Sequence, residues 1–192
     1  MLVRKLSASL AAATLAGAGL LATAVPAQAD EITCRGTIGA RTVDGSINVP
    51  TCATCTLNGT TVKGNVFVRS GATAVLNDAY VEGSVQAVRH YNVVIKNTTT
   101  VKGDVQLSDG RFATVTRSAV EGSIQAKNNR STMSTTYNTV KGDIQFFSNV
   151  GAAKTISYNR VDGNLQCKSN SPAPTGTGNR VAGNKEDQCR GL

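Results

Sequence analysis

The heptapeptide Val101-Lys102-Gly103-Asp104-Val105-Gln106-Leu107 recurs in near-copies along most of the chain. The copies begin at Val43, Val62, Val81, Val101, Val120, Val140, Val161 and, in altered form, Val181. Their glycines are separated by 19, 19, 20, 19, 20, 21 and 20 residues. A repeat of this period indicates a solenoid, in which each copy contributes one coil and stacks on its neighbours.

Apolar and polar residues alternate within each copy, as in Val105, Gln106 and Leu107. A period of two predicts a strand with one buried face. The glycine present in every copy, here Gly103, falls on the inward parity. It therefore indicates a bend in the strand or a narrow point in the core, with a simple turn glycine as the alternative.

The segments between copies hold 12 to 14 residues and often a second short apolar run, such as 93–95. No segment has helical periodicity, and none is long enough for a crossover helix, so the coils must stack in parallel at ~4.8 Å. The fold expected is a single-domain, all-β, right-handed parallel β-helix of about eight rungs of 19–21 residues. The left-handed form is the alternative, but it usually carries hexapeptide repeats.

Stacked coils align equivalent residues in columns. The column before the glycines alternates in charge and consists of Asp44, Lys63, Glu82, Lys102, Glu121, Lys141 and Asp162. Opposite charges on neighbouring strands stabilise by ~0.2–1 kcal/mol, whereas like charges destabilise. We expect this charge ladder to maintain register and solubility rather than to serve catalysis.

A second column, three residues after the glycines, is dominated by glutamine. It contains Gln86, Gln106, Gln125, Gln145 and Gln166, preceded by Asn48 and Phe67. Its outward parity predicts either a structural ladder of stacked amides or a flat docking face for a glycan or a protein. Two residues further on, Arg69, Lys127 and Lys168 form an interrupted basic column.

Residues 1–29 have the pattern of a secretory signal peptide. Arg4 and Lys5 precede an Ala-rich apolar run at 10–25, and Ala27-Gln28-Ala29 is a small-x-small cleavage site. A membrane anchor is the alternative interpretation, although small residues interrupt the apolar run. The mature chain, residues 30–192, would then be a secreted or cell-wall-associated protein with no transmembrane segment.

The mature chain would keep 18 basic and 12 acidic residues, because only Arg4 and Lys5 leave with the leader; its net charge would be +6. This excess favours anionic partners such as cell-wall glycans or lipid headgroups, although solubility alone would also explain it. We expect no nucleic-acid partner, and the sequence does not indicate an oligomeric state.

Export favours pairing of the five cysteines. Cys167 and Cys189 each follow a glutamine on adjacent rungs, which predicts a disulfide across the segment 169–178, an irregular loop rich in Pro and Gly. Cys34 and Cys55 share inward parity and form the second predicted pair. Pairing of Cys34 with Cys52 is the alternative to this second pair.

Residues suited to catalysis or metal binding are few. His90 is the only histidine and is expected in a turn, and Cys52-Ala53-Thr54-Cys55 lacks further metal ligands, so we expect no metal, cofactor or catalytic residue. Asp104 and Asp143 share a column but lie two rungs, ~9.6 Å, apart. A polysaccharide lyase or hydrolase, the alternative function, would need clustered carboxylates.

The repeated pattern Val-x-Gly-[Asn/Asp]-[Ile/Val]-Gln over residues 43–167 resembles that of the bactofilins, polymer-forming right-handed β-helix proteins of bacteria. Bactofilins lack export signals and terminal disulfides. The ending, with Asp162-Gly163-Asn164-Leu165-Gln166-Cys167 and Gly183-Asn184-Lys185-Glu186-Asp187-Gln188-Cys189, resembles the tail of secreted actinobacterial proteins of unassigned function. The second resemblance implies an exported β-helix and no particular activity.

These patterns predict a secreted, non-enzymatic β-helix that acts as a structural, adhesive or binding module at the cell envelope. Its contact surface would be the face formed by the glutamines and the charge ladder. End-to-end self-assembly is a third hypothesis, and the charged residues Lys185, Glu186 and Asp187 in the last rung argue against it.

Overall fold

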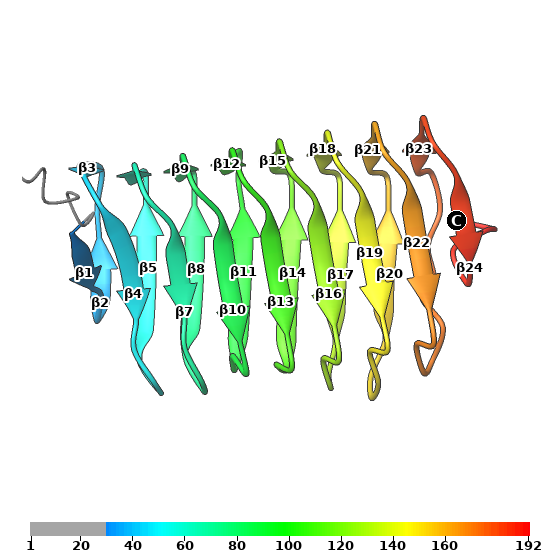
Figure 1. Cartoon of the computed structure of the whole chain (residues 1–192), viewed down its shortest axis with the longest axis horizontal. Helices are drawn as coiled ribbons and strands as arrows, with labels where there is room; N and C mark the ends of the chain where they lie inside the picture. Colours follow the sequence, from blue (N-terminus) through cyan, green and yellow to red (C-terminus); the bar gives the residue numbers. More distant parts are fainter. Residues whose placement is uncertain (1–29) are drawn as a thin grey trace, which may run out of the picture.

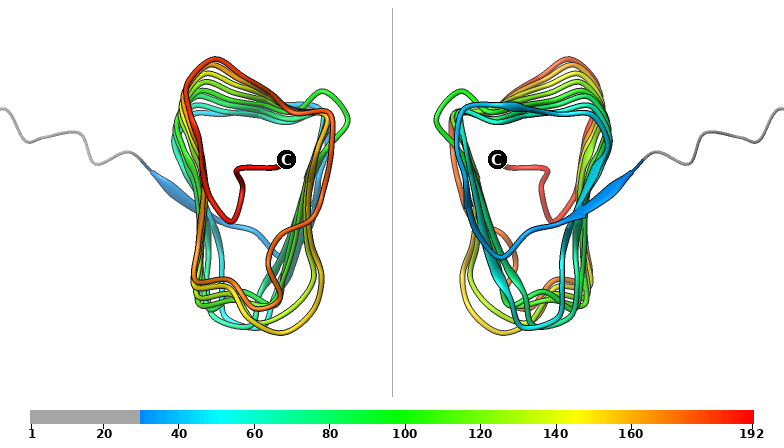
Figure 2. Two further views of the ribbon diagram at one scale, coloured as in Figure 1. Left: turned by 90° about the vertical axis from the view of Figure 1, so that its right-hand side faces the viewer. Right: turned by 90° about the vertical axis from the view of Figure 1, so that its left-hand side faces the viewer.

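The computed structural model describes residues 30–192, so the predicted signal peptide lies outside the described residues. The described chain contains 24 strands and no helix. It winds around one long axis as a right-handed coil of about eight turns (Figure 1). Viewed along this axis, successive turns superimpose on a three-sided outline (Figure 2). The predicted parallel β-helix is confirmed.

Each side of the coil is one parallel sheet. Sheet A has nine strands: β1 (Glu31–Thr33), β4 (Ser46–Val49), β7 (Val66–Val68), β10 (Val85–Val88), β13 (Val105–Ser108), β16 (Ile124–Lys127), β19 (Ile144–Phe147), β22 (Leu165–Lys168) and β24 (Lys185–Asp187). Sheet B has seven strands: β2 (Gly36–Ile38), β5 (Thr54–Asn58), β8 (Thr73–Asn77), β11 (Asn92–Lys96), β14 (Phe112–Thr116), β17 (Met133–Thr136) and β20 (Lys154–Ser157). Sheet C has eight short strands: β3 (Thr42–Val43), β6 (Thr61–Val62), β9 (Tyr80–Val81), β12 (Thr100–Val101), β15 (Ala119–Val120), β18 (Thr139–Val140), β21 (Arg160–Val161) and β23 (Arg180–Val181).

The core is a set of apolar columns inside the coil. In one turn, Ile95 of sheet B, Val101 of sheet C, and Val105 and Leu107 of sheet A are all buried. Their β-branched and aliphatic side chains suit a pleated surface, and burying each one stabilises the fold by roughly 1.5–3 kcal/mol. Because the next turn repeats the same positions, the core is continuous along the axis.

The repeated heptapeptide is not one continuous strand. The prediction of a single strand from the alternation of apolar and polar residues was therefore wrong. β12 ends at Val101 and β13 begins at Val105, and the chain bends between them where sheet C gives way to sheet A. A Cβ at Gly103 would lie 2.8 Å from the carbonyl oxygen of Gly83, one turn earlier. Only glycine fits this stacked corner, which confirms the bend interpretation.

The residue after each glycine closes the same corner. Its side-chain oxygen accepts a hydrogen bond of 2.7–3.0 Å from the backbone N–H of the equivalent residue one turn later. The accepting residues are Ser46, Asn65, Ser84, Asp104, Ser123, Asp143 and Asn164. They satisfy backbone groups at the bend, where the strands are interrupted.

Buried asparagines close the other two corners in the C-terminal half. Between sheets A and B, Asn149 donates through Nδ2 to the Ala126 carbonyl (3.0 Å) and to Asn170 Oδ1 (2.9 Å). Its Oδ1 accepts from the Asn129 backbone N–H at 3.0 Å. The corner between sheets B and C repeats this arrangement with Asn138, Asn159 and Asn179. These buried amides therefore replace backbone pairing where the chain turns.

Two disulfides join adjacent turns near the ends of the solenoid. Cys34 pairs with Cys55 and Cys167 with Cys189, with Cα–Cα distances of 5.6 and 5.1 Å. Both predicted pairs are confirmed, and Cys52 is an exposed free thiol. The segment 169–178 between the last two turns forms only an isolated bridge, Thr155 to Thr175, as expected for an irregular loop.

Candidate functional site

The outer face of sheet A carries the predicted glutamine column. Strand pairing aligns its side chains in one file: Asn48, Phe67, Gln86, Gln106, Gln125, Gln145, Gln166 and Glu186. All five glutamines are half-buried between neighbouring side chains. Parallel strands lie ~4.8 Å apart, so the file presents one amide at that interval along the axis.

The amides differ in how they are engaged. Gln145 Nε2 donates to Gln166 Oε1 at 2.8 Å, and Gln166 Nε2 donates to a Glu186 carboxylate oxygen at 2.9 Å. Within the described chain, the side chains of Gln86, Gln106 and Gln125 make no hydrogen bond to protein. The C-terminal end of the file is thus an amide ladder, while the first three amides keep unused hydrogen-bonding groups.

A hollow of about 380 Å³ lies at the N-terminal end of this file. It is lined by Thr51, Phe67, Val68, Arg69, Ser70, Gln86, Val88 and Arg89. The volume is within the range of ~300–1,000 Å³ typical of small-ligand pockets. The sequence gives no sign of this hollow, because Thr51 and Arg89 lie in turns outside the repeated columns.

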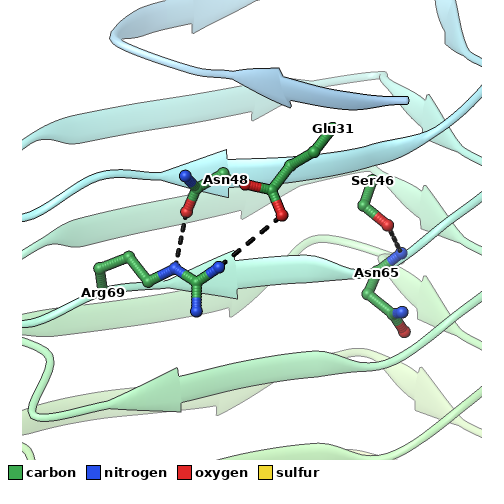
Figure 3. A network of polar contacts seen from close by, with 5 residues as sticks. All are labelled: Glu31, Ser46, Asn48, Asn65 and Arg69. Carbon is green, nitrogen blue, oxygen red and sulfur yellow. Dashed lines mark hydrogen bonds and ion pairs between the residues drawn. The ribbon is translucent and has the colours of Figure 1, made fainter. Parts of the chain in front are cut away.

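Arg69 is held over Phe67, with its guanidinium carbon 5.0 Å from the ring centroid. Figure 3 shows how the guanidinium is positioned: Nε donates to Asn48 Oδ1 at 2.8 Å, and the Glu31 carboxylate lies 3.7 Å from a terminal nitrogen. The same view includes the corner bond from the Asn65 N–H to Ser46 Oγ. The first two coils thus fix a cation beside the glutamine file.

The charge ladder lines the corner between sheets C and A, and its ion pairs are discontinuous. Glu121 pairs with Lys102 (2.6 Å) and with Lys141 (3.3 Å). The hydrogen bond from Lys102 and then that from Lys141 hold the pKa of Glu121 below its usual value. Lys63 pairs with Asp44 at 2.9 Å.

The other two acids of the ladder do not extend these pairs. Within the described residues, no ion pair joins Glu82 to either neighbouring lysine. Asp162 lies 3.7 Å from Arg160 Nε on its own coil and makes no ion pair with Lys141. Exposed pairs of this kind contribute ~0–1 kcal/mol each, so register depends more on the core and the corners than on the ladder.

Asp104 and Asp143, the acids considered for catalysis, belong to the corner. Asp104 Oδ1 accepts from the Ser123 N–H at 2.8 Å, and Asp143 Oδ1 accepts from the Asn164 N–H at 2.7 Å. Residues 30–192 contain no group of three or more His, Cys, Asp or Glu side chains placed to hold a metal ion.

His90 lies in the turn between β10 and β11, as expected, but it is fully buried. Gly110, one turn later, leaves room for the imidazole, because a Cβ there would overlap the ring. Neither ring nitrogen has a hydrogen-bond partner within the described chain. Burial lowers the pKa of His90 to about 4, against a smaller opposing effect of the Ala87 and Phe112 backbones.

Lys154 on β20 is a buried cation that the sequence did not reveal, with 1% of its surface exposed. Its Nζ donates to the backbone carbonyls of Ala152 (2.9 Å) and Ser171 (3.0 Å). Desolvation lowers the pKa of this ammonium group. Its contacts tie the irregular loop 169–178 to the preceding turn.

Two structural features bear on the environment of the protein. Disulfides persist in oxidising compartments, so the two bridges are consistent with an extracellular protein. Across residues 30–192, no helix has the length and apolar character needed to cross a bilayer. No protein-family model, curated protein or solved structure matches the chain.

Proposed function

We propose that this protein is a secreted, non-enzymatic binding module of the cell envelope that holds an extended polymer along the outer face of sheet A. The observation that carries the proposal is the file of in-register amides, three of which make no side-chain hydrogen bond to any residue of 30–192. A polymer lying along the axis would meet a donor and an acceptor on each of the three successive coils that carry Gln86, Gln106 and Gln125.

Positive charge beside the file favours an anionic polymer such as a cell-wall glycan. Arg69 and Arg89 line the hollow at one end of the file, and Lys127 and Lys168 lie exposed two positions beyond glutamines of later coils. A cationic border raises the local concentration of an anionic ligand and strengthens each hydrogen bond that it makes.

The rigidity of the coil reduces the entropic cost of binding. Every glutamine of the file lies on a strand paired with its neighbours, and the corners at both ends of these strands are hydrogen-bonded. A surface that is already ordered loses little backbone freedom when a ligand binds. Adhesion through many weak contacts per chain is the behaviour expected of such a surface.

The test is a pull-down of the mature chain, residues 30–192, on purified cell wall and on soluble anionic glycans. Gln106→Glu and Gln125→Glu together place two carboxylates on the file and should abolish retention. The matched control, Thr114→Glu with Ser134→Glu, places the same charges on adjacent strands of sheet B and should leave retention unchanged.

Equal retention of both double variants, or no retention of the unmodified chain, would refute the proposed surface. A reducing-sugar assay on the bound glycan distinguishes binding from cleavage. New reducing ends would favour the alternative function, a polysaccharide-active enzyme.

A further inference from the structure

Two stacked tyrosines form an exposed cluster at the corner between sheets B and C. Tyr137 and Tyr158 occupy equivalent positions on successive turns and are 51% and 49% exposed. Their ring centroids are 4.9 Å apart and the rings are nearly parallel, at 12°. The Arg117 guanidinium lies 5.4 Å from the Tyr137 centroid. Aromatic area that remains in water in this way is available to a ligand.

Gly178 occupies the next position of the same column and extends the opening. The Tyr158 ring lies where a side chain at Gly178 would project, so at this position of the following turn the ring meets glycine backbone instead of a side chain. A hollow of about 340 Å³ results, lined by Tyr137, Tyr158, Asn159, Arg160, Gly178 and Arg180. Its volume suits one or two sugar-sized rings, since small-ligand pockets start at ~300 Å³.

Two arginines face each other beside the tyrosines. Arg160 of β21 and Arg180 of β23 are directly paired in sheet C, and both are exposed. Like charges opposite each other on neighbouring strands destabilise a sheet. The Asp162 carboxylate lies 3.7 Å from Arg160 Nε, but no carboxylate within the described residues pairs with Arg180. The second hollow at this corner, about 260 Å³, is also lined by both arginines and Asp162.

The cluster is rigidly placed by the buried ladder below it. Asn159 separates Tyr158 from Arg160; its N–H donates to Asn179 Oδ1 at 3.1 Å, and its Nδ2 donates to the Thr135 carbonyl at 2.8 Å. Tyr158 has a φ of 55°, which is uncommon for a tyrosine. The backbone therefore presents an aromatic ring and a guanidinium from two positions fixed by one asparagine.

We propose that this corner, the tyrosine–arginine cluster, binds an anionic sugar residue. The C–H groups of the sugar ring would lie against the Tyr158 face on the Gly178 side, because the opposite face stacks on Tyr137 and aromatic faces carry partial negative charge. Its carboxylate or phosphate would bridge Arg160 and Arg180, whose planar guanidinium groups bind such anions with paired hydrogen bonds. The site lies outside sheet A and does not depend on the function proposed for the glutamine file.

Calorimetric titration of residues 30–192 tests the site with four probes: methyl glucuronide, glucose 6-phosphate, methyl glucoside and inorganic phosphate. Both anionic sugars should bind. The neutral glucoside, which has no anionic group, and free phosphate, which has no sugar ring, should each bind at least about tenfold more weakly. Preference for one anionic sugar over the other identifies a carboxylate or a phosphate as the physiological anion.

Two variants connect binding to the cluster. Arg180→Gln removes the unneutralised charge, and Tyr158→Asn removes the ring while keeping a residue that tolerates positive φ. Each should lower the affinity by about tenfold or more. Tyr80→Ala is the matched control, since Tyr80 is exposed on sheet C four turns away and should not affect binding. Binding of neither anionic sugar, equal binding of all four probes, or unchanged affinity in both site variants would overturn the proposal.

Discussion

Replacing Asn149 with alanine should destabilise the protein far more than the same replacement at Asn77. Both asparagines belong to axial ladders. Asn149 is fully buried, whereas Asn77 is half-exposed and its side chain bonds to the side chains of Asn58 and Asn97 on the surface. Both positions keep the residue type and an axial ladder of amides, so the comparison separates buried amides that bond to backbone groups from surface amides that bond to one another.

The magnitude follows from the hydrogen bonds that would be lost. Asn149→Ala leaves the buried Asn129 N–H without its acceptor and removes the bonds from Nδ2 to the Ala126 carbonyl and to Asn170. A buried donor without a partner costs ~1–3 kcal/mol, and each of the two further bonds contributes ~1 kcal/mol, so the total is about 3–5 kcal/mol. Asn77→Ala should change the free energy of unfolding by no more than ~0.5 kcal/mol.

Urea denaturation of the disulfide-bonded chain, followed by circular dichroism, gives the free energy of unfolding of each variant. Hydrogen exchange adds a local measurement, because a repeat array can lose part of its coils separately. In Asn149→Ala, the Asn129 amide should exchange faster than in the unmodified protein. The reasoning fails if the two variants differ by less than ~0.5 kcal/mol or if the Asn129 amide keeps its protection.

Three further predictions follow from the buried and cross-linked positions. The free energy of unfolding should fall by about 3 kcal/mol as the pH drops from ~6.5 to about 4, because unfolding lets His90 bind a proton that the fold excludes. His90→Asn should remove this part of the pH dependence in denaturation curves, and an unchanged slope would exclude His90 as its source. Gly103→Ala should lower the thermal stability by the equivalent of ~1–3 kcal/mol or more, because the new Cβ would lie 2.8 Å from the Gly83 carbonyl oxygen. An unchanged melting temperature would show that the backbone at the corner can move to accommodate the methyl group. Replacing Cys167 and Cys189 with alanine should destabilise the last coil by about 3 kcal/mol, which is the loop-closure entropy expected for a separation of 22 residues. Hydrogen exchange should then increase in β22–β24, and uniform exchange along the chain would contradict this local effect.

The period and parity of the repeat were enough to predict the fold and both disulfides. The nearly constant spacing of the glycines, 19–21 residues, required stacked coils, and the shared inward parity of Cys34 and Cys55 indicated their pairing across adjacent turns. The bend at Gly103 was not predicted as a strand boundary, because apolar residues on both sides of it point inward and the alternation continues across the corner. Only the close approach of stacked glycine backbones reveals the break.

The buried asparagines and the tyrosine–arginine cluster were missed for a different reason. Asn129 and Asn149 are 20 residues apart, so their column was readable, but a polar residue inside a solenoid contradicts the apolar-core rule unless its hydrogen bonds are known. Tyr137 and Tyr158 adopt positive φ, which tyrosine does not favour by itself, so local propensity gave no sign that they stack. Both features depend on contacts between turns.

The pairing of Glu121 with lysines on both neighbouring coils restricts how the length of this protein can change. Deletion of the single coil that carries Glu121 would set Lys102 directly beside Lys141, and the two ammonium groups would repel each other. Deletion of two coils, those of Glu121 and Lys141, would instead bring Lys102 next to Asp162 and keep opposite charges adjacent. Versions with whole turns removed or inserted in even numbers should therefore be the more stable ones, by up to ~1 kcal/mol for each junction.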